Sequence, residues 1–89
     1  MKILWDERKN KKLIAERGIS FETVSELILQ KRYVAVLENS ARKGQYIFLV
    51  PIDGYIHVVP FIIDSDDNII LKTIYPSRKF QSMYGDKLP

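Results

Sequence analysis

A pair of cations near the end of the chain is the first candidate for chemistry. Arg78 and Lys79 follow the last predicted strand, where a strand end or a helix start can present them to a phosphate group. The guanidinium group of Arg suits this role because it makes two parallel hydrogen bonds to a phosphate. Alternatively, both residues are solvated cations at a helix start, where the helix dipole slightly disfavours positive charge. The residues themselves leave both interpretations open.

Three side chains are candidates for proton transfer. His57 is the only histidine, and imidazole is the side chain that ordinarily titrates near neutral pH. Strand alternation places His57 on the same face as Val59 and Phe61, so packing is its alternative role. Tyr75 and Tyr84 each carry a hydroxyl that can act as an acid and a ring that can stack on a base. For both tyrosines the alternative is packing in or beside the core.

Two further basic groups are candidates for holding a phosphate backbone. One is a predicted helix face that carries Lys9 and Lys12, and the other is the loop pair Arg42 and Lys43. A basic face attracts phosphate or an acidic protein segment, whereas the alternative is an ordinary solvated surface. The acidic turn at residues 64–68 resembles a calcium loop but lacks the Gly and Glu that such a loop needs at its sixth and twelfth positions. We therefore expect no metal there.

The composition excludes most other kinds of site. The chain has 89 residues, no Cys and a single His. It therefore has no disulfide framework, no thiolate metal site, no cysteine nucleophile and no pair of histidines for acid–base work. We expect neither a metal nor a cofactor. The length fits one domain over residues 1–89, with a frayed tail at 85–89, and is too short for a dinucleotide enzyme or a barrel enzyme.

The charge is modest and uneven. The net charge is +3, with ten Lys and Arg against six Asp and Glu through residue 49, and four against five after it. This imbalance fits a polyanionic or acidic partner, although a charge of this size also serves solubility. The first residues become charged too early for a signal peptide, and no apolar run reaches the roughly 18 residues of a membrane helix. We expect a cytoplasmic protein without membrane contact.

Local signals predict that a short strand and two helices begin the chain. Asp6 is the expected N-cap of a helix that runs to about Arg17, and Gly18 is the expected left-handed residue after it. Ser20 is the expected N-cap of a second helix. That helix carries an apolar stripe at helical spacing, formed by Phe21, Val24, Leu27 and Ile28, which we expect to be core.

The rest of the chain has the period of strands. Apolar runs at 33–37, 46–52, 55–63 and 69–75 are followed by a short helix in the tail. The Asp53-Gly54 pair predicts a tight hairpin, which would place His57 opposite Val50. If Ile63 pairs with Ile69, Tyr75 falls near His57. The order β-α-α-β-β-β-β-α predicts an α+β fold in which two N-terminal helices pack on one face of an antiparallel sheet.

At its two ends the chain resembles a known family. The opening Trp5-Asp6-Glu7-x-Lys9-Asn10, then Arg17-Gly18-Ile19-Ser20-Phe21, and the closing Ser77-Arg78-Lys79 are similar to BrnT-type toxins of bacterial toxin–antitoxin pairs. The resemblance implies a RelE-like fold and a metal-independent ribonuclease. It also implies a cognate antitoxin partner with a DNA-binding segment, and assembly as a dimer or a toxin–antitoxin hetero-oligomer.

The function predicted from this resemblance is an endoribonuclease that cleaves RNA by attack of the 2′-hydroxyl. Such cleavage needs a base, cations around the phosphate and an acid for the leaving oxygen, and Arg, Lys, Tyr and His suffice. The expected catalytic residues are Arg78, Lys79, His57, Tyr75 and Tyr84, and the expected RNA-binding residues are Lys9, Lys12, Arg42 and Lys43. The alternative is a non-catalytic module that binds protein or RNA, since Arg17 stands where the family commonly has His.

Overall fold

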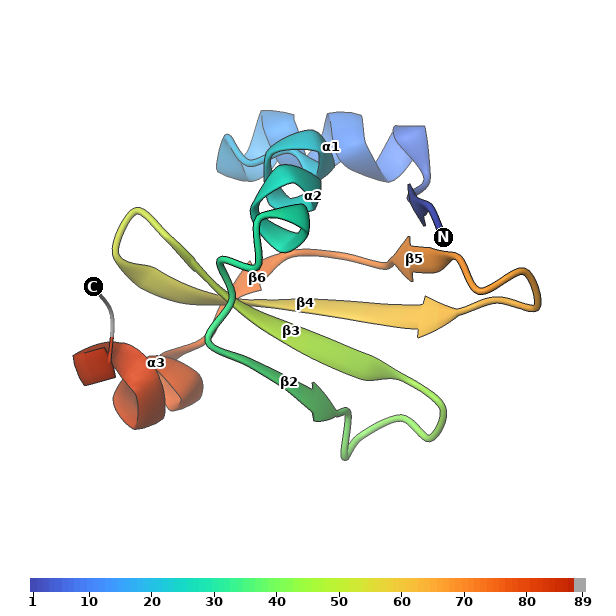
Figure 1. Cartoon of the computed structure of the whole chain (residues 1–89). Coiled ribbons are helices and arrows are strands. Elements are labelled where there is room, and N and C mark those ends of the chain that lie inside the picture. The colour runs from blue at the N-terminus through green and yellow to red at the C-terminus, as the bar shows by residue number, and fades with distance from the viewer. Residues whose placement is uncertain (88–89) are drawn as a thin grey trace.

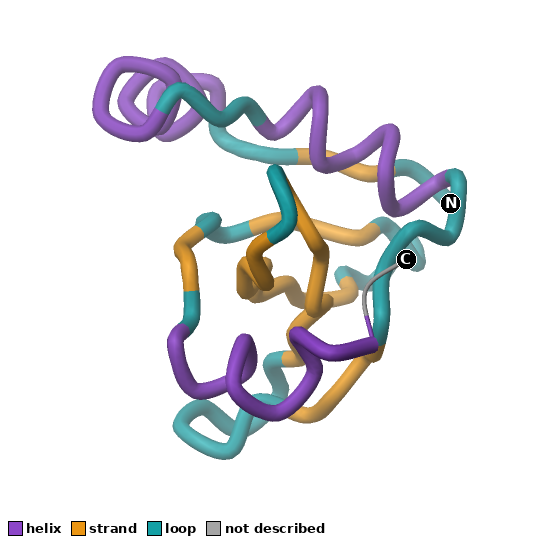
Figure 2. Tube along the Cα trace, turned by 90° about the vertical axis from the view of Figure 1, so that its left-hand side faces the viewer, coloured by secondary structure: helices purple, strands orange, loops and turns teal. Residues whose placement is uncertain are grey.

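The computed structural model describes residues 1–87 as a curved, open sheet with helices on both faces (Figures 1 and 2). In chain order the elements are β1 (Ile3–Leu4), α1 (Glu7–Arg17), α2 (Phe21–Leu29), β2 (Ala35–Glu38), β3 (Tyr46–Ile52), β4 (Tyr55–Ile63), β5 (Ile69–Leu71), β6 (Tyr75–Pro76) and α3 (Arg78–Tyr84). The predicted α+β class and element order are therefore confirmed, with the last predicted strand divided in two. Of the tail expected at 85–89, Gly85–Lys87 form a 3-10 turn, and residues 88–89 lie outside the described chain.

The two N-terminal helices start and stop at the predicted residues. The Asp6 carboxylate accepts hydrogen bonds from the backbone N–H groups of Arg8 and Lys9. Gly18 ends α1 in the left-handed conformation, with φ 68°. The Ser20 hydroxyl accepts a hydrogen bond from the backbone N–H of Thr23 at the start of α2. Each cap satisfies backbone groups that a helix end leaves without partners, so these boundaries follow from local chemistry.

One buried amide fastens the two helices together. Asn10 of α1 is 1% exposed. Its carbonyl oxygen accepts the backbone N–H of Phe21 at 2.8 Å, and its amide nitrogen donates to Glu22 at 2.6 Å and to Glu7 at 3.1 Å. An α1 side chain thus serves as a second cap for α2 and ties the start of α2 to the first turns of α1.

The sheet has the strand order β1-β5-β4-β3-β2. The β3–β4 hairpin turns at Asp53 and Gly54, both with positive φ (52° and 75°), and His57 lies opposite Val50 as predicted. The sheet departs from the predicted antiparallel arrangement at one edge, where β1 pairs parallel to β5. This pairing places the start of α1 at the β5 edge.

An extra residue separates β5 from β6. Phe61 pairs with Leu71 and Val58 pairs with Tyr75, so three steps along β4 face four steps along the partner strand. Such a bulge shifts the register by one residue and turns every later side chain to the other face. Ile63 does pair with Ile69 as predicted, but the bulge places Pro76 opposite His57 and Tyr75 opposite Val58, one residue away from the predicted register.

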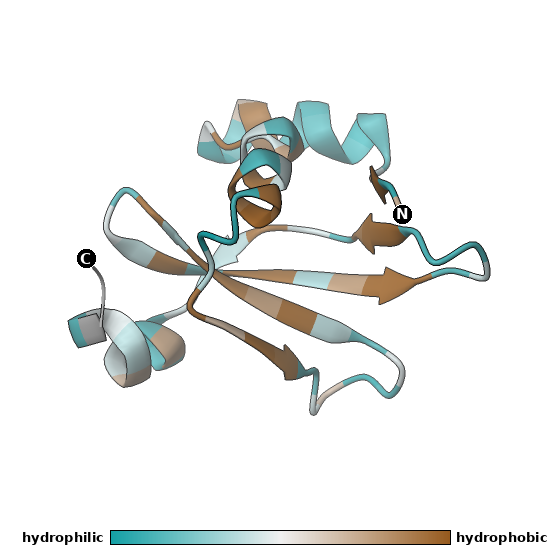
Figure 3. Ribbon diagram, viewed as in Figure 1, coloured by the Kyte–Doolittle hydropathy of each residue, from teal (hydrophilic) through white to brown (hydrophobic). Residues whose placement is uncertain are grey.

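Both faces of the sheet carry a core. The larger core lies under α1 and α2 and contains Phe48, Phe61 and the apolar stripe of α2, with Trp5 stacked on Phe21 at 5.9 Å between ring centroids. The smaller core, around Leu49 and Ile56, is covered by Phe80 and Tyr84 of α3. Figure 3 shows that α1 is largely hydrophilic, and only Asn10 and Leu13 of this helix are buried. Most of the α1 surface is therefore available for contact with other molecules.

The acidic turn between β4 and β5 is held by one carboxylate. Asp64 accepts hydrogen bonds from the backbone N–H groups of Asn68 and Asp66, both at 2.9 Å. These bonds, that of Asn68 foremost, hold the pKa of the Asp64 carboxyl below its usual 3.8. The turn is thus explained by backbone hydrogen bonding to Asp64, as its composition favours.

We expect Asp64 to make stability depend on pH in acid. Because its pKa is lower in the folded chain, its contribution is present above the unfolded pKa of about 4 and disappears as the pH falls through the folded value. Thermal melts between pH 6 and pH 2.5 should show a steeper loss for the natural chain than for Asp64→Asn. Asp66→Asn, two residues away, serves as the control. Parallel curves for the natural chain and Asp64→Asn would contradict this assignment.

Candidate nucleic-acid interface

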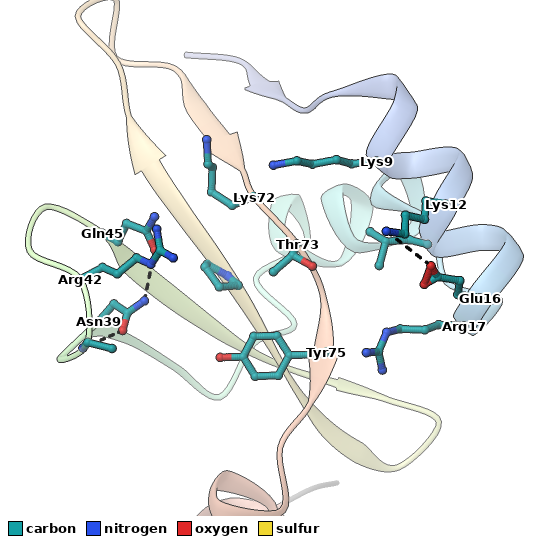
Figure 4. A pocket seen from close by; sticks show the side chains of 13 residues that line it. Lys9, Lys12, Glu16, Arg17, Asn39, Arg42, Gln45, Lys72, Thr73 and Tyr75 are labelled. Carbon is teal, nitrogen blue, oxygen red and sulfur yellow. Dashed lines mark hydrogen bonds and ion pairs between the residues drawn. The ribbon is translucent and has the colours of Figure 1, made fainter.

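A groove of about 600 Å³ lies over the segment that joins β5 to β6. Figure 4 shows α1 side chains on one side of it, side chains of the β2–β3 loop on the other, and Lys72, Thr73 and Tyr75 between them. We call this the basic groove. Its lining residues are Lys9, Lys12, Leu13, Glu16, Arg17, Asn39, Ala41, Arg42, Gln45, Pro60, Lys72, Thr73 and Tyr75.

The charge of the basic groove is strongly unbalanced. Five cations line it, namely Lys9, Lys12, Arg17, Arg42 and Lys72, against the single carboxylate of Glu16. Glu16 pairs with Lys12 at 3.8 Å, and among the side chains that the structure describes, those of residues 1–86, this is the only ion pair within 4.0 Å. The other four cations therefore have no carboxylate partner. Unneutralised charge of one sign in a concave surface attracts ligands of the opposite sign.

The α1 helix and the β2–β3 loop place the side chains on the two sides of the groove. Lys9, Lys12 and Glu16 recur at helical spacing, so one face of α1 points into the groove. The loop is ordered by Asn39, whose carbonyl accepts the Arg42 N–H at 3.2 Å and whose side-chain amide donates to Gln45 at 3.2 Å. These hydrogen bonds within the loop fix the position of Arg42 relative to Asn39 and Gln45.

The bulge determines which side chains of the third segment enter the groove. Leu71 and Ile74 are both buried in the core beneath the helices. The two residues between them leave that face, and Lys72 continues the ladder through its N–H bond to the Pro60 carbonyl at 2.8 Å. Tyr75 then lies opposite Val58, on the face away from the helices. Without the extra residue, alternation would point Ile74 outward and Tyr75 inward.

The structure brings together four of the predicted site residues. Lys9, Lys12, Arg42 and Tyr75 all line the basic groove, whereas the exposed Lys43 does not. His57 lies away from them. It is 8% exposed, and its Nδ1 lies 2.9 Å from the carbonyl oxygen of Tyr55.

The remaining predicted site residues belong to α3. Arg78 and Lys79 are exposed in its first turn, which Ser77 caps by accepting the Phe80 N–H at 3.2 Å. The Lys79 ammonium lies 5.4 Å from the centroid of the Phe80 ring, and Tyr84 packs against the smaller core. These three residues do not line the basic groove. The structure thus presents two separate cationic surfaces.

Several residues of the groove were not predicted from the sequence, above all Arg17, Lys72 and Gln45. Lys72 carried a signal, since the polar pair Lys72-Thr73 interrupts the apolar run 69–74. In a strand buried on one face, two adjacent polar residues between two apolar ones mark a break in alternation. Arg17 and Gln45 join the groove through tertiary packing and had no comparable local signal.

Comparison with known proteins identifies the fold. The crystal structure of the Brucella abortus ribonuclease toxin BrnT superposes with a TM-score of 0.65 at 19% sequence identity, over 86% of this chain and 96% of BrnT. The chain has the BrnT fold. No protein-family model matches the sequence, and no curated protein matches it. The similarity to BrnT predicted from the two ends of the chain is therefore confirmed at the level of fold, and the RelE-like detail stays a prediction.

Within this BrnT-like fold, the opening motif has a structural role that explains its spacing. Asp6 caps α1, Gly18 ends it, and Asn10 and Ser20 both cap α2. Of the motif's cations, Lys9 and Arg17 line the basic groove. Across residues 1–87, no helix is long and apolar enough to span a membrane, and no three His, Asp or Glu side chains are grouped to hold a metal ion.

Proposed function

We propose that this protein is an endoribonuclease toxin that binds RNA in the basic groove and cleaves it without a metal ion. The observation that carries the proposal is the groove itself, in which five cations and one carboxylate share a lining with Tyr75 in the fold of a ribonuclease toxin. We further propose that it acts in the cytoplasm, and that a cognate antitoxin neutralises it in a toxin–antitoxin hetero-oligomer.

The groove suits a single-stranded sugar–phosphate backbone. Lys9, Lys12 and Arg17 approach from α1, and Arg42 approaches from the opposite loop (Figure 4). Cations on both sides neutralise successive phosphates and position the strand without reading its sequence. The Thr73 hydroxyl is then available for a hydrogen bond to a base, whereas the side-chain amides of Asn39 and Gln45 bond to each other.

The cleavage chemistry needs only groups of this groove. The 2′-oxygen attacks the adjacent phosphorus, the bond from phosphorus to the 5′-oxygen breaks, and a 2′,3′-cyclic phosphate and a 5′-hydroxyl result. Lys72 and Arg42 stabilise the charge that develops on the phosphate oxygens. The Tyr75 hydroxyl supplies the proton to the 5′-oxygen, and Glu16 is the groove's one carboxylate that can accept the proton of the 2′-hydroxyl.

Incubation of the purified protein with a single-stranded RNA oligonucleotide in EDTA tests this proposal. The expected products end in a 2′,3′-cyclic phosphate and a 5′-hydroxyl, and the matching DNA oligonucleotide stays intact because it lacks the 2′-oxygen. RNA that stays intact, or cleavage that stops in EDTA, would contradict the proposed chemistry. Expression without an antitoxin should also arrest growth.

A second candidate function is a binding module without catalysis. The observation in its favour is that His57, the only imidazole, is buried away from the basic groove. In that case the groove binds RNA as tightly in EDTA as without it, but the RNA stays uncut. Gel-shift and cleavage assays on the same oligonucleotide distinguish the two functions.

Lys9 is expected to contribute to binding through its charge alone. For single-stranded RNA, each phosphate contact contributes about 0.7 to the slope of log K against log salt concentration. Lys9→Ala should make that slope shallower by about 0.7, whereas Lys11→Ala, which changes an exposed neighbour outside the groove, should leave it unchanged. Fluorescence anisotropy between 50 and 300 mM salt measures both slopes. Equal slopes for Lys9→Ala and the natural chain would remove Lys9 from the interface.

A further inference from the structure

A second groove has a volume of about 560 Å³. It is formed by the last turn of α2, the segment that leads into β2, and the tip of the β3–β4 hairpin. We call it the α2 groove. Its lining residues are Leu27, Lys31, Arg32, Tyr33, Val34, Pro51 and Gly54, and none of them belongs to the basic groove.

The α2 groove combines an apolar lining with unpaired cations. Leu27, Val34 and Pro51 supply aliphatic surface, and Lys31 and Arg32 are exposed beside it. In the described chain, no hydrogen bond or ion pair engages the side chains of Lys31, Arg32 or Tyr33. The Tyr33 ring is held in place by Phe48, with 5.2 Å between the ring centroids. The groove therefore offers a fixed apolar surface with three free polar groups beside it.

The backbone places Lys31 here in a conformation that an L-residue rarely adopts. Lys31 has φ 57° and ends α2 in a Schellman motif, in which its own N–H bonds to Ile28 at 2.9 Å and the N–H of Arg32 bonds to Leu27 at 2.8 Å. Glycine usually occupies this position because it has no Cβ to strain. A lysine at this position caps the helix no better than a glycine would. What it adds is a side chain at the groove. Strain of this kind often marks a functional position.

We propose that the α2 groove is a docking site for a short protein segment in which aliphatic residues alternate with Asp or Glu. Aliphatic side chains would fill the space between Leu27, Val34 and Pro51, and the carboxylates would pair with Lys31 and Arg32. Charge complementarity favours this occupant over a basic or neutral segment. An RNA strand fits less well, because its sugar–phosphate backbone would leave the aliphatic surface of Leu27, Val34 and Pro51 without an apolar partner. This inference does not depend on the proposed ribonuclease activity.

Two synthetic peptides test the proposal. One is a fluorescein-labelled 12-residue peptide with alternating Leu and Asp, and the other has Asn in place of every Asp. We expect the acidic peptide to bind at least tenfold more tightly at 100 mM salt. In ¹⁵N-labelled protein it should shift the amide signals of Leu27, Tyr33 and Gly54. Equal affinities, or shifts confined to the basic groove, would overturn the proposal, as would RNA shifting these same amides.

Charge reversal provides the matched control. Lys31→Glu with Arg32→Glu should weaken binding of the acidic peptide at least tenfold. Arg8→Glu with Lys11→Glu makes the same change in net charge on α1, outside both grooves, and should have less than a threefold effect. RNA cleavage by the Lys31 and Arg32 variant should be unchanged, so failure here is distinguishable from failure of the proposed function. Equal effects of the two double variants would show attraction by net charge alone and would overturn the docking site.

Lys31→Gly separates the side chain from the backbone. Relief of the left-handed strain should raise the midpoint of thermal unfolding by about 4 °C. The same substitution removes one cation from the groove and should weaken binding of the acidic peptide about threefold. A variant that gains stability without losing affinity would exclude Lys31 from the proposed site.

Discussion

An Arg42→Ala, Lys72→Ala double variant is expected to cleave RNA at least a hundredfold more slowly than the natural chain. Both side chains line the basic groove, from the β2–β3 loop and from the bulge, and neither has a carboxylate partner in residues 1–87. Removing one group that stabilises charge in a transition state commonly costs about 10²–10³ in rate. Single-turnover cleavage with saturating protein measures the effect on chemistry apart from binding.

Two further variants make this result interpretable. Arg8→Ala with Lys11→Ala removes the same two residue types from exposed α1 positions outside the groove, and should leave the rate within about threefold. Arg78→Ala with Lys79→Ala tests the other predicted site, on α3. If that variant loses cleavage while the Arg42 and Lys72 variant keeps it, the catalytic centre lies at the start of α3 and our groove assignment is wrong.

Asn10→Ala is expected to destabilise the protein by about 3 kcal/mol, the largest effect we expect from a single substitution outside the apolar core. The change removes three hydrogen bonds and leaves the N–H of Phe21, which is 0% exposed, without its acceptor. An unsatisfied buried donor costs about 1–3 kcal/mol, and bonds to charged groups add to this. Urea denaturation followed by circular dichroism measures the loss, with Lys11→Ala on the same helix as the control.

Asn10→Asp distinguishes the amide donors from the acceptor. The new carboxylate still accepts the Phe21 N–H but faces Glu7 and Glu22, to which Asn10 now donates. Like charges raise the pKa of such a group in the folded chain, so this variant should recover stability as the pH falls from 7 towards 4. A loss for Asn10→Asp that stays constant with pH would show that Glu7 and Glu22 are not partners in solution.

Much of the fold could be predicted because its signals are local. Asp6, Gly18 and Ser20 mark helix ends through hydrogen bonds and φ values that involve only a few neighbouring residues. The Asp53-Gly54 turn fixed the β3–β4 register and therefore the position of His57 opposite Val50. The second role of Asn10 could not be predicted in this way, because its partner Phe21 lies eleven residues away on another helix.

The same distinction between local signals and tertiary contacts holds for the candidate site. The sequence by itself determined which functional groups a site can use. The chain has no Cys, one His, and an excess of Lys and Arg in its first half. It also indicated four residues of the basic groove, Lys9, Lys12, Arg42 and Tyr75, without indicating that they meet.

Only the tertiary structure decided which of these residues share a surface. The parallel pairing of β1 with β5 places α1 at the sheet edge, and the extra residue before Tyr75 turns that side chain away from His57 and towards the cations. Strand alternation has a period of two, so one added residue reverses the face of everything that follows. The position of the extra residue depends on tertiary packing, because it allows both Leu71 and Ile74 to be buried beneath the helices. These helices are far away in sequence.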